Sequence, residues 1–279
     1  MRNTLVVRSV AGALFALGAW VAYTQTPQAP PKLSLDKVKD DLYVISGDGG
    51  NVAVYLTNEG VIVVDDKFER DVTDILAKIK SLTDKPVKYV LNTHQHGDHT
   101  GGNQILLSQT EILIHQNARA NMAAGKMPGI PHLTYSDQTG VYLGGKEAVA
   151  KHFGRGHTNG DAAIYFPALK TVHMGDLFVV GAPFIDYSGG GSAKAWDETI
   201  NGALKWDFDT VIPGHGPVSK REDLIKFRDN FTKMRSAVST MARAGKSKDD
   251  VGKMLIKDFG FSAESIGMRS VDGMIAELK

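Results

Sequence analysis

Residues 94–99 constrain the fold of this chain more than any other segment. They read His-Gln-His-Gly-Asp-His and follow an apolar run at residues 87–91 that is typical of a buried strand. Imidazole and carboxylate groups are ligands that suit zinc and neighbouring divalent metals. The chain holds 9 histidines in 279 residues, so a solvated loop is a poor explanation for this clustering. The segment therefore predicts a metal site at the end of a strand.

The spacing inside this segment predicts two groups of ligands. Side chains alternate along an extended backbone, so His94 and His96 can point to the same side. Gly97 allows a tight turn, after which Asp98 and His99 face a second point close by. Two adjacent ligand groups are typical of two-metal hydrolytic centres, whose metals stand ~3.5–4 Å apart.

Composition narrows the classes of function. With 42% apolar residues, a chain of 279 residues can bury a substantial core in one domain, or in two at most. Lys and Arg number 32 against 31 Asp and Glu, and the net charge of +1 gives no basis for a nucleic-acid or anionic-membrane partner. The chain has no Cys, which excludes disulfides and Cys-ligated metals.

The first 31 residues have the layout of a secretory signal peptide. Arg2 and Arg8 provide a basic start, residues 10–22 are apolar and uncharged, and residues 24–31 are polar and rich in Pro. The uncharged stretch is short for a spanning helix of ~20 residues, and an uncleaved N-terminal anchor is the alternative. We therefore expect export, to the periplasm, of a catalytic domain at residues 32–279 that ends in helices.

Hydrophobic periodicity after the leader predicts a fold of class α/β (α+β), with two sheets packed between helical layers. Apolar runs predict strands at residues 42–46, 52–57, 61–64, 87–91, 111–114, 140–143, 148–153, 162–166, 171–174 and 210–212. Helical spacing and a capping box predict helices at residues 69–82, 101–107 and 193–204, one that ends near residue 124, and a long one from residues 219–222 onward. Two loops, at residues 125–138 and 181–192, are expected to shape the pocket.

Three later segments can supply further ligands, each at the end of a strand-like run. His157 lies in Gly-Arg-Gly-His-Thr, where the glycines permit close approach of the backbone. Asp176 directly follows Val-His-Met-Gly, and His215 lies between two glycines in Ile-Pro-Gly-His-Gly. One loop of four ligands cannot complete two metal sites, so these three residues are candidates for the rest.

These four motifs, in this order, resemble the metallo-β-lactamase superfamily from about residue 42 to residue 218. The resemblance implies a four-layer αββα sandwich with the metals at the sheet edge. It also implies one metal held by three histidines, a second held by one carboxylate and two histidines, and a carboxylate that bridges both. The residues are His94, His96 and His157 for the first metal, Asp98, His99 and His215 for the second, and Asp176 for the bridge.

The same resemblance assigns roles beside the metals. Asp65 occupies the position of an acid that supports the metal loop through outer hydrogen bonds, which fix imidazole orientation; a structural role at the strand end is the alternative. Tyr187 is a candidate acid, because lactonases of this superfamily often use a Tyr near the metals; an incidental place in its loop is the alternative. The remaining histidines of the later chain are expected to be structural or exposed: His115, His132, His152 and His173.

Together these features predict a dinuclear zinc hydrolase, with iron or manganese as alternative metals. Hydroxide generated at the metals would attack the carbonyl of a small cyclic amide or ester, and Asp98 would hold the nucleophile and shuttle its proton. A β-lactam is the leading substrate. Val179, however, stands where many β-lactamases of the cysteine-ligand subclasses carry a substrate-binding Lys.

Other readings of the same residues stay open. A bridging Asp176 resembles glyoxalase II, a thioester hydrolase, and also lactonases. A mono-iron persulfide dioxygenase shares several of the ligands, and a non-catalytic metal-binding protein could share the fold, although lost ligands would mark it. We expect a small-molecule substrate, no nucleic-acid partner and no membrane contact beyond a possible N-terminal anchor. The sequence leaves the oligomeric state open.

Overall fold

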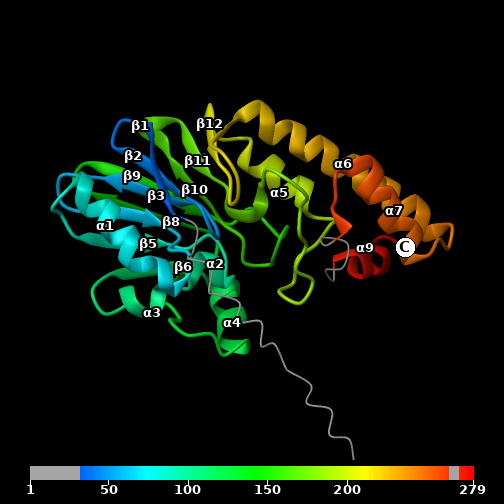
Figure 1. The fold of residues 1–279 in the computed structure, drawn as a ribbon, viewed down its shortest axis with the longest axis horizontal. Coiled ribbons are helices and arrows are strands. Elements are labelled where there is room, and N and C mark those ends of the chain that lie inside the picture. The colour runs from blue at the N-terminus through cyan, green and yellow to red at the C-terminus, as the bar shows by residue number, and fades with distance from the viewer. Residues whose placement is uncertain (1–31, 264–269) are drawn as a thin grey trace, which may run out of the picture. The chain divides into compact units, whose positions relative to one another are not determined.

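Apolar runs in the first half of the chain form a seven-stranded sheet (Figure 1). The computed structural model describes residues 32–263 and 270–279, so the predicted leader at residues 1–31 lies outside the described residues. The strands lie in chain order across the sheet: β1 (Ser34–Lys39), β2 (Leu42–Ser46), β3 (Val52–Leu56), β4 (Val61–Val64), β5 (Val87–Leu91), β6 (Glu111–His115) and β7 (Leu133–Tyr135). Strands β1 to β4 pair antiparallel and β4 to β7 pair parallel. The loop after β5 therefore emerges at the edge where parallel strands end, which is where open α/β sheets bind ligands.

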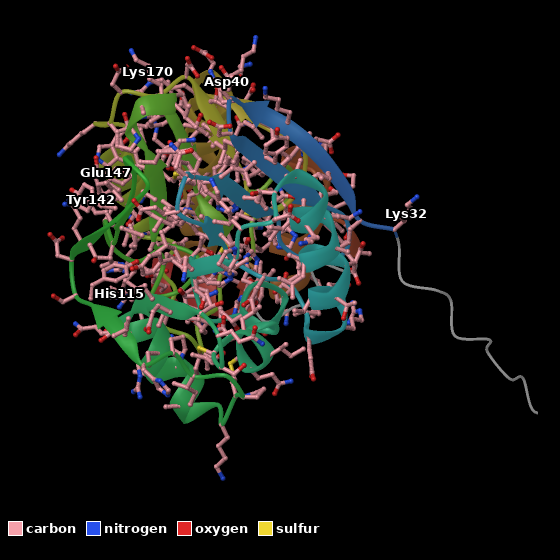
Figure 2. All side chains as sticks on the ribbon, turned by 90° about the vertical axis from the view of Figure 1, so that its left-hand side faces the viewer. Lys32, Asp40, His115, Tyr142, Glu147 and Lys170 are labelled. Carbon is pink, nitrogen blue, oxygen red and sulfur yellow. The ribbon has the colours of Figure 1, made fainter. Side chains whose placement is uncertain are left out.

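The second half of the chain forms a six-stranded sheet. Its order from one edge to the other is β13 (Ser219–Lys220), β12 (Thr210–Ile212), β11 (Thr171–His173), β10 (Ala163–Phe166), β9 (Lys146–Lys151) and β8 (Gln138–Leu143). All neighbours pair antiparallel except β11 and β12, which are parallel. On the exposed hairpin of β8 and β9, the hydroxyl of Tyr142 donates to Glu147 at 2.7 Å (Figure 2).

The two sheets pack face to face through buried apolar side chains. The first sheet contributes Leu42, Val44, Ala53, Tyr55, Ile62, Val64 and Leu91, and the second contributes Val141, Ala148, Ala150, Ile164, Phe166 and Ile212. The rings of Tyr55 and Phe166 meet edge-on with their centres 5.1 Å apart. Burying an apolar side chain of this size stabilises the fold by about 1.5–3 kcal/mol. This layer therefore fixes the position of the two sheets relative to each other, and with it the positions of their strand ends.

Helices cover the outer face of each sheet, which confirms the predicted four-layer αββα sandwich (Figure 1). On the first sheet, α1 (Val72–Leu82) buries Val72, Ile75 and Ile79 against the strands. The short helix α4 (Gln116–Ala124) packs Ala118 and Met122 beside the end of β6.

The second sheet is covered by α5 (Trp196–Ala203) and by the long helix α6 (Arg221–Arg243). One face of α6 packs into this core: Leu224, Phe231, Met234 and Val238 are buried, and Phe227 and Met241 are partly buried. Helices α7 (Lys248–Phe259) and α9 (Ser270–Leu278) pack into the same core. Within residues 32–263 and 270–279, three short 3-10 turns complete the elements: η1 (Glu69–Asp71), η2 (Pro167–Leu169) and η3 (Gly175–Leu177). Among the described residues, no helix combines the length and apolar character that crossing a membrane requires.

The predicted helix at residues 101–107 is present but shorter, as α3 (Asn103–Leu106), and a separate short helix, α2 (Gly97–Thr100), precedes it. At the break, the N–H of Gly102 donates to the carboxylate of Asp66 at 2.9 Å rather than to a helical carbonyl. A side chain at Gly102 would overlap Asp66, so a tertiary contact that sequence periodicity does not contain ends the helix.

The predicted start of the long helix is one residue early. Ser219 belongs to β13, and its hydroxyl donates to the carbonyl of Pro217 at 2.9 Å. Lys220 is the residue that precedes α6, and its N–H donates to the Asp223 carboxylate at 3.1 Å. The reciprocal acid of the capping box is therefore Asp223, not Glu222.

Candidate metal centre

The loop after β5 carries the first group of ligand atoms. Nε2 of His94 and Nδ1 of His96 stand 3.2 Å apart. His157, from the loop after β9, brings its Nε2 to 2.8 Å from Nδ1 of His96. Two nitrogens bound to one tetrahedral zinc at about 2.0–2.1 Å would stand roughly 3.3 Å apart. The three imidazoles thus converge on one point with a spacing close to that of a single metal site.

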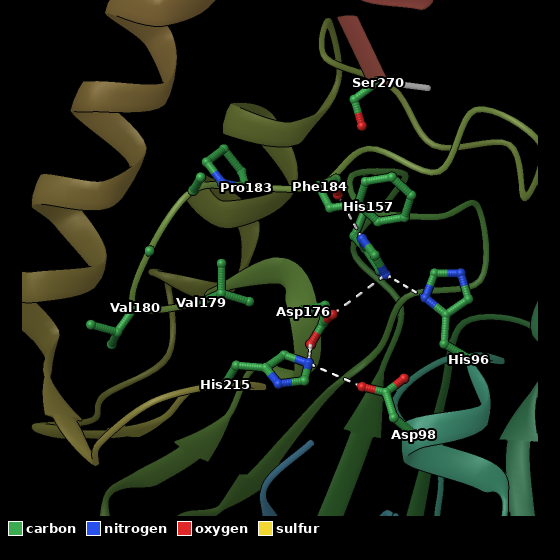
Figure 3. Close-up of a pocket in the computed structure, with 12 residues that line it drawn as sticks. His96, Asp98, His157, Asp176, Val179, Val180, Pro183, Phe184, His215 and Ser270 are labelled. Carbon is green, nitrogen blue, oxygen red and sulfur yellow. Dashed lines mark hydrogen bonds and ion pairs between the residues drawn. The ribbon is translucent and has the colours of Figure 1, made fainter. Parts of the chain in front are cut away.

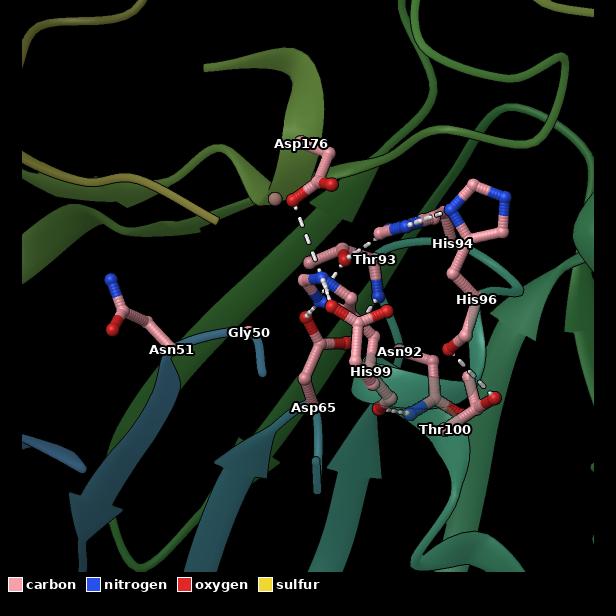
Figure 4. A network of polar contacts seen from close by, with 12 residues as sticks. Gly50, Asn51, Asp65, Asn92, Thr93, His94, His96, His99, Thr100 and Asp176 are labelled. Carbon is pink, nitrogen blue, oxygen red and sulfur yellow. Dashed lines mark hydrogen bonds and ion pairs between the residues drawn. The ribbon is translucent and has the colours of Figure 1, made fainter. Parts of the chain in front are cut away.

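The second group lies beside the first, where α2 begins and β12 ends. Figure 4 shows His99 of this group near His94, Asp65 and Asp176. Nε2 of His99 stands 3.5 Å from Oδ2 of Asp98 and 3.4 Å from Nε2 of His215. Nε2 of His215 is 3.3 Å from the same Asp98 oxygen. Gly97 makes no left-handed turn here, because it is the first residue of α2. The helix, rather than the glycine, directs the second group away from the first.

Asp176 lies between the two groups, in the turn η3 that follows β11. Its Oδ1 stands 3.3 Å from Nε2 of His99 and 3.4 Å from Nε2 of His215, and its Oδ2 stands 3.6 Å from Nε2 of His157. Oδ1 is buried and lacks a partner with hydrogen-bond geometry among the described residues. A buried, unpartnered carboxylate oxygen that faces two imidazoles fits a bridging metal ligand. The residues present therefore fit two divalent ions, with Asp176 as the shared ligand.

Asp65, at the end of β4, holds the second group from outside. Its Oδ2 lies 2.8 Å from Nδ1 of His99, and its two oxygens accept hydrogen bonds from the N–H and hydroxyl of Thr93 at 2.7 and 2.8 Å. The Thr93 hydroxyl also lies 3.0 Å from Nδ1 of His94. Such outer contacts fix the ring orientation of ligating histidines. The structure thus places Asp65 where the sequence-based proposal for it requires.

Asp186 plays the corresponding part for the first group, and sequence analysis missed it. Its Oδ2 lies 2.9 Å from Nε2 of His96, which leaves Nδ1 of that ring free to face the metal position. Nδ1 of His157 donates in the same way to the carbonyl of Phe184 at 2.7 Å. Both partners belong to the loop at residues 181–192, whose sequence has no periodicity that would single out one acid.

At Gly50 and Gly214, close backbone packing against the ligands leaves no room for a side chain. A Cβ at Gly50 would overlap the imidazole of His99, and a Cβ at Gly214 would overlap the Asp176 carboxylate. Asn51 ties these segments together, because its side-chain amide donates to the carbonyl of Pro213 at 2.9 Å. The first sheet is thereby fixed to the loop that carries the last histidine.

Burial and neighbouring charges set the protonation state of the ligand side chains differently in the two groups. Burial lowers the pKa of His94 well below its usual value and that of His157 to about 4, so both rings are neutral. Burial opposes the charge of Asp98, but the hydrogen bond with His215 and the charges of His99 and His215 together outweigh it and lower the pKa of Asp98 to about 2. Burial also opposes the charge of His215, yet its contacts with Asp176 and Asp98 raise its pKa to about 9. His94, His157 and Asp98 are thus in the state that divalent metals bind, whereas a metal at the second group must displace a proton from His215.

A cleft of about 530 Å³ opens onto these residues (Figure 3). One side presents His96, Asp98, His157, Asp176 and His215, and the other presents Val179, Val180, Gly181, Ala182, Pro183, Phe184 and Ser270. Among the described residues that line the cleft, none is Lys or Arg. The loop at residues 181–192 therefore shapes the pocket as expected. The expectation for residues 125–138 is wrong, because residues 133–135 form β7 and Gly129 packs against Asn103 instead.

Tyr187 is not among the residues that line the cleft. Its hydroxyl donates to Glu277 in α9 at 2.9 Å, and burial followed by this hydrogen bond raises its pKa. The side chain is therefore directed to the C-terminal helix, which corrects the expectation of an acid facing substrate.

The other histidines have structural partners or lie apart from the site. The rings of His115 and His152 stack 4.1 Å apart, and Nδ1 of His152 donates to the backbone carbonyl of Asp161 at 2.7 Å. His173 is buried, and its Nε2 donates to the carbonyl of Asn51 at 3.0 Å. His132 lines a separate surface groove.

Comparisons with known proteins agree with this geometry. The family model described as the metallo-beta-lactamase superfamily matches residues 45–215. The chain is 24% identical over 255 residues to a type 2 metallo-beta-lactamase of Bacillus cereus, covering 82% of this chain and 99% of that protein. It is 35% identical over 89 residues to a hydroxyacylglutathione hydrolase of Crocosphaera subtropica, covering 32% of this chain and 33% of that protein.

Solved structures show the same fold. A metallo-beta-lactamase from Pontibacter korlensis superposes with a TM-score of 0.65 at 21% identity, covering 72% of this chain and 99% of that chain. The DIM-1 metallo-beta-lactamase gives a TM-score of 0.65 at 20% identity, covering 73% and 98%. The family match spans well over half of the chain and includes all seven converging ligand residues. The chain therefore belongs to the metallo-β-lactamase superfamily.

Proposed function

We propose that this protein is a dinuclear metal-dependent hydrolase of small carbonyl substrates, with zinc as its metal. The observation that carries the proposal is Asp176, whose two carboxylate oxygens face different ligand groups at the floor of an open cleft. Two divalent ions bound there would lower the pKa of water and polarise a carbonyl oxygen. Iron and manganese accept the same nitrogen and oxygen donors and are the alternative metals.

The chain's own residues account for the remaining steps. Asp98 lines the cleft with a 25% exposed side chain, so its carboxylate can accept a hydrogen bond from the attacking water and then take its proton. The wall at residues 179–184 packs against the substrate's apolar part and limits access of bulk water. No nucleophilic side chain is needed, because water is the nucleophile.

A β-lactam is the first candidate substrate, because the relatives that match most of the chain are metallo-beta-lactamases. The cleft wall favours a second candidate, an uncharged lactone or simple ester, since its described lining is apolar and offers no cation for a substrate carboxylate. A thioester is a third, supported by the hydroxyacylglutathione hydrolase match over part of the chain.

Metal analysis combined with hydrolysis of three substrates tests the proposal. Purified protein is assayed by elemental mass spectrometry and with a chromogenic cephalosporin, an aryl lactone and a glutathione thioester, each with and without a chelator. We expect about two zinc ions per chain and chelator-sensitive turnover of one substrate class. The double variant His94→Ala/His96→Ala should lose both the first metal and turnover.

Other results would contradict the proposal in defined ways. A single iron per chain would point to oxidative chemistry instead of hydrolysis. Two bound metals without turnover of any class would favour a metal-binding protein that is not an enzyme. Turnover that survives metal removal would overturn the mechanism.

A further inference from the structure

The C-terminal helix α9 forms hydrogen bonds with the loop at residues 181–192 on both sides of Asp186. On one side, the Ser270 hydroxyl accepts a hydrogen bond from the N–H of Ile185 and donates to its carbonyl, both at 3.1 Å. On the other side, the Glu277 carboxylate accepts hydrogen bonds from the hydroxyl of Tyr187 at 2.9 Å. The residue that holds the His96 ring therefore lies between two residues that α9 fixes.

Glu277 makes two further contacts at the end of the same loop. Its carboxylate accepts from the hydroxyl of Ser192 at 2.5 Å and from the N–H of Ala193 at 2.8 Å. Gly273, one turn earlier in α9, lies so close to Tyr187 that a Cβ there would overlap the aromatic ring. The three hydrogen bonds of the Glu277 carboxylate and the close packing of Gly273 against Tyr187 thus fix the loop to the helix.

The loop at residues 181–192 provides outer contacts to the histidines of the first ligand group, and Asp65 provides that of the second. Phe184 and Asp186 hold the rings of His157 and His96, which belong to the first group. The corresponding outer contact of the second group comes from Asp65 at the end of β4, in the other sheet. A shift in the position of this loop would therefore change the orientation of the first group's histidines and leave the second group unchanged.

We propose that Glu277 is a positioning residue that sets the affinity of the first metal, held by His94, His96 and His157, through the loop that carries Asp186. This inference rests on the metal centre of the proposed function. It assigns to the C-terminal helix a role at a metal site through a loop that lies some 90 residues earlier in the sequence. Outer-contact residues of metal sites typically alter affinity by about 10–100-fold when they are changed.

A metal titration tests this inference without relying on turnover. Metal-free full-length protein is titrated with zinc in competition with a chromogenic chelator, which resolves the two dissociation constants. The variant His157→Ala identifies which constant belongs to the second group, because it removes a ligand of the first group only. For Glu277→Ala, we expect the first constant to rise about tenfold and the second to stay unchanged.

Matched variants separate this effect from a general loss of stability. Glu277→Gln keeps one of the two acceptor oxygens, either the one for Ser192 or the one for Ala193 and Tyr187. Its first constant should therefore lie between those of wild type and Glu277→Ala. Asp272→Asn removes an acid of the same helix that is exposed and pairs with Lys248 of α7 at 2.5 Å, so both constants should match wild type. Tyr187→Phe removes a single hydroxyl and should weaken the first metal in the same direction, which keeps the test decisive where Glu277→Ala does not fold.

The outcomes separate this inference from the proposed function. Equal weakening of both metals, or unchanged affinities in Glu277→Ala and Tyr187→Phe, would overturn the positioning role. Wild-type protein that binds no zinc would overturn both proposals. Two zinc ions with the selective loss in the variants, but no hydrolysis of any substrate, would support the positioning role while the proposed function fails.

Discussion

At the scale of single residues, metal binding depends on the space beside the ligands as much as on the ligands themselves. His99 is fully buried and held by Asp65, so it cannot move aside for a new neighbour. Gly50→Ala would place a Cβ inside this imidazole. We expect the variant to lose the second metal and keep the first, as measured by zinc content per chain.

Gly97→Ala provides the matched control within the ligand loop. Gly97 has helical backbone at the start of α2, and a Cβ there would meet nothing within 4 Å. This variant should bind the same amount of zinc as wild type. Equal zinc content in Gly50→Ala and wild type would contradict the packing argument.

Single residues also show what sequence can reveal about a site. The ligand candidates could be predicted because each lies in a short motif directly after an apolar run, as Asp176 and His215 do. Asp186 could not, because an acid in an aperiodic loop carries no signal of the imidazole that it contacts. Tyr187 was assigned to the cleft for the same reason: loop sequence does not determine the direction of a side chain.

At the scale of an element, the start of α4 depends on a histidine that must stay neutral. Nδ1 of His115 accepts from the N–H of Asn117 at 3.3 Å, and its Nε2 donates to the carbonyl of Ser136 at 3.0 Å. Burial, followed by the charge of His152, lowers the pKa of His115 to about 4. Between pH 6.5 and 4 the unfolded chain takes up a proton that the folded chain does not, so stability falls as the pH falls.

His115→Asn should remove this pH dependence, because Asn also caps helices but does not titrate. We expect the variant's free energy of unfolding, relative to wild type, to improve by about 1 kcal/mol between pH 7 and pH 5.5. Urea unfolding of metal-free protein at both pH values measures the change. A difference between the two proteins that is independent of pH would contradict it.

Elements differ in how far periodicity predicts them. Strands such as β5 and β12 match their predicted ranges, because the apolar residues that are buried in the sheet are visible as apolar runs in the sequence. The break between α2 and α3 could not be predicted, since it depends on the contact of Gly102 with Asp66 from another part of the chain.

At the scale of the whole molecule, each sheet supplies part of every ligand group. The first sheet provides His94 and His96 to the first group, and His157 arrives from the second sheet. The second group combines Asp98 and His99 of the first half with a histidine that follows β12. The metal centre therefore forms only when the two sheets pack together. The order of the motifs along the chain predicts this assembly through family resemblance, because local periodicity does not show which strand ends meet.

Anomalous scattering from crystals of the zinc-loaded protein tests the two-metal centre most directly. The account predicts two zinc peaks about 3.5–4 Å apart, one within each ligand group and with the Asp176 carboxylate between them. A single peak, or two peaks that Asp176 does not bridge, would contradict it.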